Sequence, residues 1–100
     1  MRVRYTPRSR RDLEEMYRYI DRQTPASARV AKITIERRIQ LLSEFPFIAP
    51  ETDVASVYGL VIGQYPYTVY YRIERDEVWI VHIRHERRQP WADNNQNYDR

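Results

Sequence analysis

The sequence predicts one α+β domain in which a helical hairpin packs on one face of a small antiparallel sheet, with the element order β-α-α-β-β-β. Two helical patterns occupy the first half of the chain, and two runs rich in β-branched and aromatic residues, joined by a polar turn, occupy the last third. A length of 100 residues suits one compact domain. We therefore place a single domain at residues 1–91 and a polar, disordered tail at residues 92–100.

The N-terminal residues predict a short strand followed by an amphipathic helix. Residues 2–6 alternate polar and apolar side chains, as a strand with one face toward the core does. Pro7 is compatible with a first helical turn whose cap is Thr6 or Ser9. Apolar residues then recur at spacings of three and four, which predicts a helix over about residues 8–23: Leu13, Met16, Tyr17 and Ile20.

A second, longer helix is predicted to begin at Thr24 and Pro25, with the Thr24 hydroxyl as its cap, and it continues to Pro46. Its apolar positions have helical spacing: Ala28, Ala31, Ile35, Ile39 and Leu42. Because the small residues come first, the two helices can approach closely there as a hairpin with its turn at residues 23–26. Residues 48–56 lack periodicity and predict the one substantial loop.

Three strands complete the predicted sheet. Residues 57–62 form a short strand candidate interrupted by Gly59, and residues 65–73 form the next one. A tight turn at residues 75–77 leads into the last strand, which begins at Val78. The last strand is apolar on both sides in its first half, which predicts a central position in the sheet.

Alternation of side chains assigns residues to the two faces of the sheet. Tyr70 and Arg72 fall on the side away from the helices, which no helix remains to cover. Strict alternation along the last strand places His85 on the same face as Trp79, and His82 on the opposite face. Both histidines are interpreted as structural residues that hydrogen-bond within the domain.

The composition excludes several classes of protein. The chain has no cysteine, so a disulfide framework and thiolate metal sites are excluded. Two isolated histidines and two glycines assemble neither a metal site nor a phosphate-binding glycine loop. No apolar run approaches the roughly 18 residues needed to cross a bilayer. The net charge of +3 is small for a DNA-binding domain. We expect a soluble cytoplasmic protein with no cofactor and no metal.

The chain resembles toxins of the RelE/ParE superfamily from bacterial type II toxin-antitoxin systems, and among these it is most similar to the ParE branch. The resemblance covers about residues 3–91 and rests on three segments in order: DLEEMYRYI (12–20) with the helix start at 25–28, YPYTVYYRI (65–73) and IVHIRHERRQPW (80–91). It implies the fold predicted above and a hetero-oligomeric complex with a ParD-like antitoxin, which alone would contact operator DNA. It also implies poisoning of DNA gyrase by binding, without enzymatic chemistry.

The RelE branch provides the alternative function, cleavage of messenger RNA in the ribosomal A site. Such cleavage needs a general base, a general acid and cations that converge on one face of the sheet. His85, Arg87 and Arg72 are the candidates here. The only lysine, Lys32, lies on the second helix, and Thr68 stands where such nucleases often carry arginine. A homologue that only regulates its operon with its antitoxin is a third possibility.

Two surfaces are expected to bind partners. The basic and aromatic end of the last strand is assigned to contact with the target or the antitoxin, because arginine and tryptophan often dominate interfaces: Arg84, Arg87, Arg88 and Trp91. The alternative is a solvated strand end on which Trp91 folds back to cap the core. The antitoxin is expected to lay a helix along the helical hairpin and an extended segment at the sheet. Its predicted contacts combine apolar bodies with polar tips: Met16, Tyr17, Tyr19, Tyr70 and Arg72.

Overall fold

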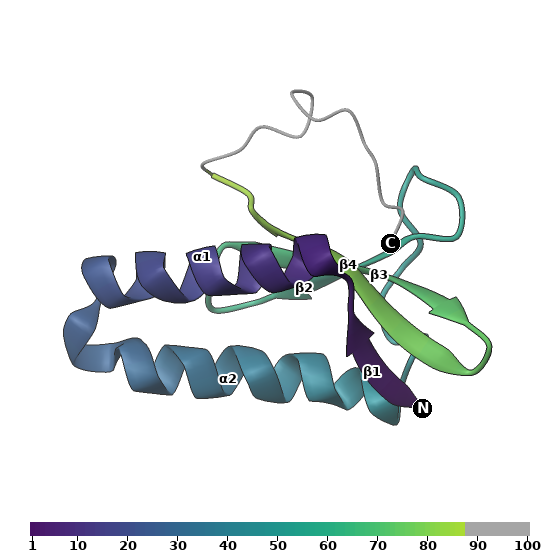
Figure 1. Ribbon diagram of the computed structural model, residues 1–100, viewed down its shortest axis with the longest axis horizontal. Helices are drawn as coiled ribbons and strands as arrows, with labels where there is room; N and C mark the ends of the chain where they lie inside the picture. Colours follow the sequence, from purple (N-terminus) through teal and green to yellow (C-terminus); the bar gives the residue numbers. More distant parts are fainter. Residues whose placement is uncertain (88–100) are drawn as a thin grey trace.

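The computed structural model describes residues 1–87, and residues 88–100, including the predicted tail, lie outside the described part. The described chain has the predicted element order (Figure 1): β1 (Arg2–Tyr5), α1 (Pro7–Gln23), α2 (Ala28–Gln40), β2 (Tyr58–Ile62), β3 (Tyr67–Glu74) and β4 (Glu77–His85). A 3-10 turn at Pro25–Ser27 connects the two helices, and a second one at Leu41–Ser43 follows α2.

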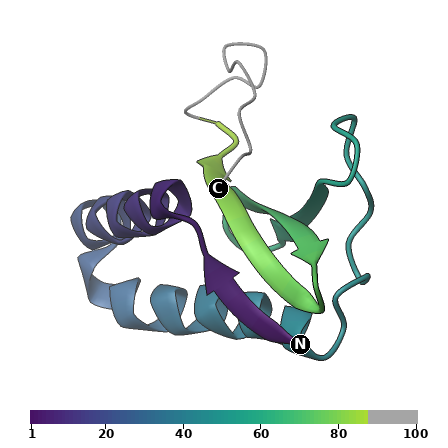
Figure 2. The same cartoon turned by 45° about the vertical axis from the view of Figure 1, so that its right-hand side comes forward.

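The four strands form one sheet in the order β1-β4-β3-β2, and both helices lie on one side of it (Figure 2). The α+β class and the central position of β4 are therefore confirmed. The prediction of a purely antiparallel sheet was wrong in one pairing, because β1 runs parallel to β4. The alternation of side chains carries no information on strand direction, and no tight turn joins these two strands. The Thr6 amide extends their ladder by donating to the Ile80 carbonyl at 3.0 Å, which brings the start of α1 alongside β4.

Both ends of α1 are fixed by threonine. The Thr6 hydroxyl oxygen accepts a hydrogen bond from the Ser9 amide at 3.1 Å, so Thr6 is the N-cap. At the other end, the Thr24 hydroxyl donates to the Ile20 carbonyl at 3.1 Å. Thr24 therefore ends α1, and the prediction that it caps the second helix was wrong. The predicted single helix up to Pro46 is divided into the two 3-10 turns and α2.

The main core lies between the helices and the sheet. The predicted apolar stripe of α2 is confirmed, since Ala31, Ile35, Ile39 and Leu42 are all buried. Met16 and Ile20 of α1 face the same core. The strands contribute the alternate residues that point toward the helices: Leu60, Ile62, Tyr67, Val69, Tyr71, Val78, Ile80 and Ile83.

A second, smaller core lies on the other face of the sheet, which the sequence had predicted to be bare. Val57, Tyr70 and Val81 are buried together there. The loop before β2 reaches this face at Gly59, where an added Cβ would lie 3.2 Å from the Thr52 side chain. Glycine therefore permits the close approach of the loop, and Gly59 lies inside β2 rather than interrupting it.

A β-bulge at Val81 changes which residues of β4 face the helices. Tyr70 pairs with His82, whereas Tyr71 pairs with Ile80, so Val81 is an additional residue in β4. A bulge shifts the alternation of side chains by one position.

The predicted faces of the two histidines were therefore wrong. His82 lies on the outer face, where its ring stacks on Tyr70 with 5.9 Å between centroids. His85 lies on the helix-facing side, with its ring 5.0 Å from the Tyr67 ring. The bulge is the physical reason, because strict alternation from Trp79 onward cannot account for an inserted residue.

The hairpin between β3 and β4 contains a stabilisation target. Glu74 pairs with Glu77, so the turn has two residues, Arg75 and Asp76, with φ values of 51° and 63°. A type I′ turn prefers Asn-Gly at these positions, because other residues adopt positive φ at a cost. We expect the double variant Arg75→Asn, Asp76→Gly to raise the free energy of unfolding by about 1 kcal/mol, measured by urea denaturation. A variant with unchanged stability would show that the turn carries no such strain.

Candidate functional site

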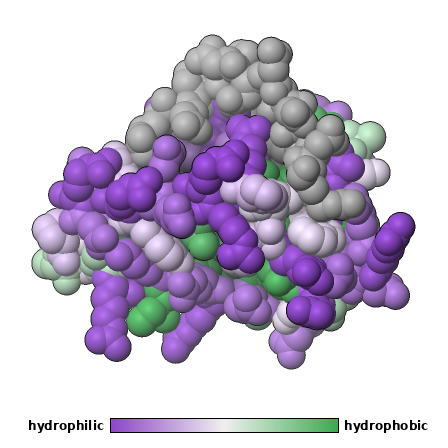
Figure 3. Space-filling view, viewed as in Figure 1, coloured by the Kyte–Doolittle hydropathy of each residue, from purple (hydrophilic) through white to green (hydrophobic). Residues whose placement is uncertain are grey.

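The exposed side of α2 is the first candidate binding surface. We define the α2 surface as Val30, Ile33, Arg37 and Arg38 of α2 together with Leu41, which begins the following 3-10 turn. By their spacing these residues lie on one side of the helix. The side chain of Val30 is 63% exposed, and those of Ile33 and Leu41 are each 36% exposed. The face of the molecule seen in Figure 1 is mainly hydrophilic, with apolar side chains exposed in separate places (Figure 3). The α2 surface thus combines apolar contact area with cationic groups.

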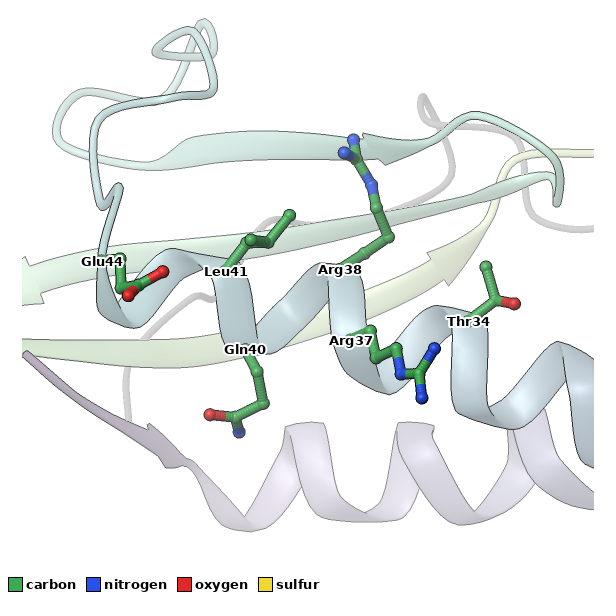
Figure 4. Close-up of a pocket in the computed structure, with 6 residues that line it drawn as sticks. All are labelled: Thr34, Arg37, Arg38, Gln40, Leu41 and Glu44. Carbon is green, nitrogen blue, oxygen red and sulfur yellow. The ribbon is translucent and has the colours of Figure 1, made fainter.

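A shallow groove of about 540 Å³ lies along the C-terminal half of α2. Figure 4 shows the six residues that line it: Thr34, Arg37, Arg38, Gln40, Leu41 and Glu44. Arg38 extends from the groove toward β2 and donates to the Val61 carbonyl at 3.2 Å. Val61 belongs to the edge strand of the sheet, so this hydrogen bond connects the groove to that edge.

The outer edge of β2 is covered over only part of its length. The Gly59 amide donates to the Pro50 carbonyl at 3.1 Å, and Glu51 forms a bridge with Tyr58. The loop thus protects the first half of the edge, whereas the Arg38 side chain binds the carbonyl in the second half. Edge strands are protected in this way against unwanted pairing.

Tyr17 lies between the two helices and joins them. Its hydroxyl donates to a carboxylate oxygen of Glu36, and the Lys32 ammonium lies 5.3 Å from the centre of its ring. Lys32 also forms an ion pair of 2.7 Å with Asp21. Burial, followed by the hydrogen bond to Glu36, raises the pKa of the Tyr17 hydroxyl well above its ordinary value. Tyr17 was predicted to bind the antitoxin, and only part of its side chain is accessible.

Stability is expected to fall at alkaline pH because of this tyrosine. Burial also raises the pKa values of Tyr5 and Tyr71. Above about pH 10 the unfolded chain loses phenolic protons that the folded chain retains. The contribution of these tyrosines to the free energy of unfolding should therefore be constant below that pH and decrease above it. Urea denaturation at a series of pH values measures this decrease. Tyr17→Phe should make the decrease smaller, and an equally steep decrease in this variant would contradict its origin in Tyr17.

The other predicted antitoxin contacts do not form one surface. Met16 is buried in the main core, because it lies on the stripe of α1 that faces the sheet, so its assignment as a direct contact was wrong. Tyr70 is also buried, in the small outer core. Arg72 is partly exposed on the outer face, where its guanidinium lies 3.8 Å from the Glu74 carboxylate. Tyr19 lines a separate pocket beside β4.

That pocket has a volume of about 360 Å³ and lies between the closed end of the helical hairpin, the turn after β2 and the end of β4. We call it the tyrosine pocket and define it by Tyr19, Tyr65, Tyr67, His85 and Arg87. The other residues that line it come from the helices and the turn: Ile20, Gln23, Thr24, Ser27, Ala31 and Pro66.

The His85 ring contacts two of the tyrosine rings of this pocket. The rings of Tyr19 and Tyr67 meet it edge-on, with centroid distances of 5.3 and 5.0 Å. The Arg87 amide donates to Nδ1 of His85 at 3.2 Å. Because Nδ1 accepts this bond, the imidazole proton lies on Nε2 in this arrangement. The structural role predicted for His85 agrees with these contacts.

Arg84 does not belong to an exposed basic tip. Its side chain is fully buried, with Nε 3.4 Å from a carboxylate oxygen of Glu86. The other carboxylate oxygen of Glu86 accepts a hydrogen bond from the Tyr70 hydroxyl at 3.0 Å. Because of the bulge, Arg84 pairs with Thr68 and lies next to this network on the outer face. Its assignment to direct target contact was wrong.

Arg87 is exposed, and its contact with a target stays a prediction. Arg88 and Trp91 lie outside the described residues. The candidates for a ribonuclease site are separated. His85 and Arg87 line the tyrosine pocket on the helix-facing side of the sheet. Arg72 lies on the outer face and near the opposite end of β3. These three side chains do not converge on one phosphate.

The sequence analysis missed the role of Asp12, which joins α1 to the edge of β4. One carboxylate oxygen lies 2.7 Å from Nδ1 of His82 and accepts a hydrogen bond from the Ile83 amide at 3.1 Å. The Arg8 guanidinium lies 4.0 Å from the same oxygen. Asp12 lies three residues after the buried Ser9 and four before the buried Met16, so an acidic residue on the buried stripe of α1 was the available signal.

Metal-binding clusters and membrane-spanning helices are both absent from the described part of the chain. In residues 1–87, no group of three or more histidine, aspartate or glutamate side chains could hold a metal ion. None of the helices in that range has the length and apolar character needed to cross a membrane.

Fold and surfaces together define a small α+β protein whose described features are suited to binding other macromolecules. The family model described as "ParE toxin of type II toxin-antitoxin system, parDE" matches residues 3–90. The chain is 33% identical over 88 residues to "Putative toxin Y4kP" of Sinorhizobium fredii, and the match covers 88% of this chain and 91% of the relative. The chain therefore belongs to the ParE toxin family of type II toxin-antitoxin systems, as its resemblance implied.

A solved structure has the same fold. The structure titled "Chromosomal ParDE TA system from P. aeruginosa" has a TM-score of 0.75 to this chain at 22% sequence identity. The similarity covers 85% of this chain and 95% of the other. At this low identity the comparison concerns the arrangement of helices and strands.

Proposed function

We propose that this toxin inhibits DNA gyrase in the bacterial cytoplasm by binding, and that a ParD-like antitoxin neutralises it in a protein complex. Operator DNA would be contacted only through the antitoxin. Membership of the ParE family supports this proposal, and so does the name of the structurally similar ParDE system. Gyrase inhibition is the function that the sequence resemblance implied for the ParE branch.

The separation of His85 from Arg72 is the observation on which we base the choice between binding and RNA cleavage. A metal-independent ribonuclease needs its base, acid and phosphate-binding cations around one reacting phosphate. Here the two residues lie on opposite faces of the sheet, and His85 packs edge-on between tyrosines. This arrangement favours a protein that acts by binding over a RelE-like nuclease.

The test compares gyrase with a translating extract. The purified toxin is added to gyrase and supercoiled plasmid, and separately to the extract with primer extension on the message. We expect linear plasmid to accumulate in the gyrase reaction, because a poison stabilises the cleaved DNA complex. Codon-phased cuts in the message would instead establish the nuclease, and no effect in either reaction would favour a purely regulatory role.

The α2 surface and the adjoining edge of β2 are the proposed contact for the antitoxin. Exposed Val30, Ile33 and Leu41 offer apolar area, and Arg37 and Arg38 offer positive charge beside it. An amphipathic helix with apolar and acidic residues would complement both features. Arg38 binds the Val61 carbonyl, so the second half of β2 adjoins this surface. This placement replaces the scattered set predicted from the sequence.

A further inference from the structure

We propose that the tyrosine pocket binds an aromatic side chain that carries a neighbouring carboxylate, presented by a protein partner. The pocket is distinct from the α2 surface, since it lies at the opposite end of the helical hairpin beside the end of β4. The proposal does not depend on gyrase or on ParD, because it concerns the chemistry of the pocket itself.

The wall of the pocket favours a planar, apolar group. Three tyrosine rings, Pro66 and Ile20 line it, and the wall is mainly apolar. Aromatic rings prefer edge-to-face or offset contacts, and His85 already makes two edge-on contacts with Tyr19 and Tyr67. A volume of about 360 Å³ lies at the lower end of the range for ligand sites, which suits one large side chain and its neighbour.

The charge at the pocket favours an acidic group beside the ring. Arg87 is exposed at the pocket, and none of the described side chains that line the pocket is a carboxylate. The adjacent Glu86 is engaged on the other side, where it binds the Tyr70 hydroxyl and pairs with Arg84. A guanidinium binds a carboxylate in a directed, charge-assisted manner.

The backbone around the pocket is held in place before a ligand arrives. The Glu86 amide donates to the Pro66 carbonyl at 2.8 Å, which ties the end of β4 to the turn after β2. In the same turn, the Tyr65 amide donates to the Ile62 carbonyl at 3.0 Å. A preformed site loses little conformational entropy on binding, so even a single side chain could be held there.

A protein partner explains the pocket better than a nucleic acid does. Tyrosine rings can also stack on nucleobases. A nucleic-acid strand, however, needs several cations for its phosphates, and within residues 1–87 Arg87 is the one arginine or lysine that lines this pocket. The mainly apolar wall and the single guanidinium fit one aromatic side chain next to one carboxylate.

The test uses the full-length protein and three small probes in a titration followed by ¹H–¹⁵N NMR. The probes are N-acetyl-L-tryptophan, its uncharged amide, and deoxyadenosine monophosphate. We expect N-acetyl-L-tryptophan to shift the amide signals of the residues that define the tyrosine pocket. Arg87→Gln should weaken this binding about fivefold or more and leave the binding of the amide probe unchanged. The control Arg75→Gln removes the same charge at the far end of the sheet and should have no effect.

Several outcomes would overturn the proposal. The pocket signals could stay unchanged with millimolar N-acetyl-L-tryptophan, or Arg87→Gln and Arg75→Gln could bind it equally well. Tighter binding of the nucleotide at the same signals would identify a nucleic-acid site instead. Binding seen only in a Trp91→Ala variant would show that the chain's own tryptophan competes for the pocket. The spectrum of each variant without probe establishes that it is folded.

Discussion

Replacement of Asp12 by alanine is expected to lower the free energy of unfolding by about 2 to 4 kcal/mol. The β1 strand pairs with β4 only up to Ile80, and the edge of β4 beyond that point lies against α1. There the Asp12 carboxylate accepts from the Ile83 amide and binds the His82 ring. His82 is almost fully buried, so water cannot readily replace the lost acceptor. Removing one carboxylate therefore affects two buried groups at once.

Urea denaturation of matched variants measures this effect. Glu15→Ala removes an exposed carboxylate from the same helix and should change the free energy of unfolding by less than about 0.5 kcal/mol. Asp12→Asn keeps one oxygen acceptor for the Ile83 amide and should recover part of the loss. If Asp12→Ala were as stable as Glu15→Ala, the carboxylate would have no structural role at the edge of β4.

The sequence predicted the order and type of the elements because each one has a strong local signal. The stripe of α2 repeats at helical spacing, and the run in β3 alternates with the period of a strand. Strand direction has no such local signal. The parallel pairing of β1 with β4 follows from the path of the whole chain between them, and a reading of short segments cannot supply it.

The wrong faces predicted for the two histidines come from one inserted residue in β4. Val81 shifts the alternation of β4, and this shift moves His82 and Arg84 to the outer face of the sheet and His85 toward the helices. A β-bulge leaves little trace in a strand that is apolar on both sides, so the sequence placed the two histidines on the wrong faces. Arg84 was expected on a surface for a different reason, since arginine is common at interfaces, although it is buried in a polar network.

The α2 surface was missed for a different reason. Val30, Ile33 and Leu41 are apolar residues between the core positions of α2. The helical spacing of apolar residues identifies only the buried stripe. Only the packing of α2 against the sheet separates the apolar residues that are buried from those that remain exposed. Met16 shows the opposite error, since an apolar residue expected at a surface belongs to the core.

The double variant Ile33→Glu, Leu41→Glu is expected to weaken binding of the ParD-like antitoxin at least 100-fold, which corresponds to about 2.7 kcal/mol. Both side chains are 36% exposed on the α2 surface, so glutamate can be accommodated without a new cavity in the core. In the complex, each carboxylate would be placed against an apolar partner residue and would lose its hydration. Apolar anchors at the centre of an interface commonly dominate its affinity.

Isothermal titration calorimetry with the purified antitoxin measures this loss, and urea denaturation of the free toxin shows whether the variant is folded. Ala55→Glu adds a carboxylate to the exposed loop before β2 and serves as the control that should bind normally. The acidic charge alone would also repel acidic residues of the antitoxin that contact Arg37 or Arg38, so Ile33→Ala, Leu41→Ala separates lost apolar contact from repulsion. Wild-type affinity in the glutamate variant would place the antitoxin elsewhere, because two buried carboxylates at a real contact cannot be neutral in free energy.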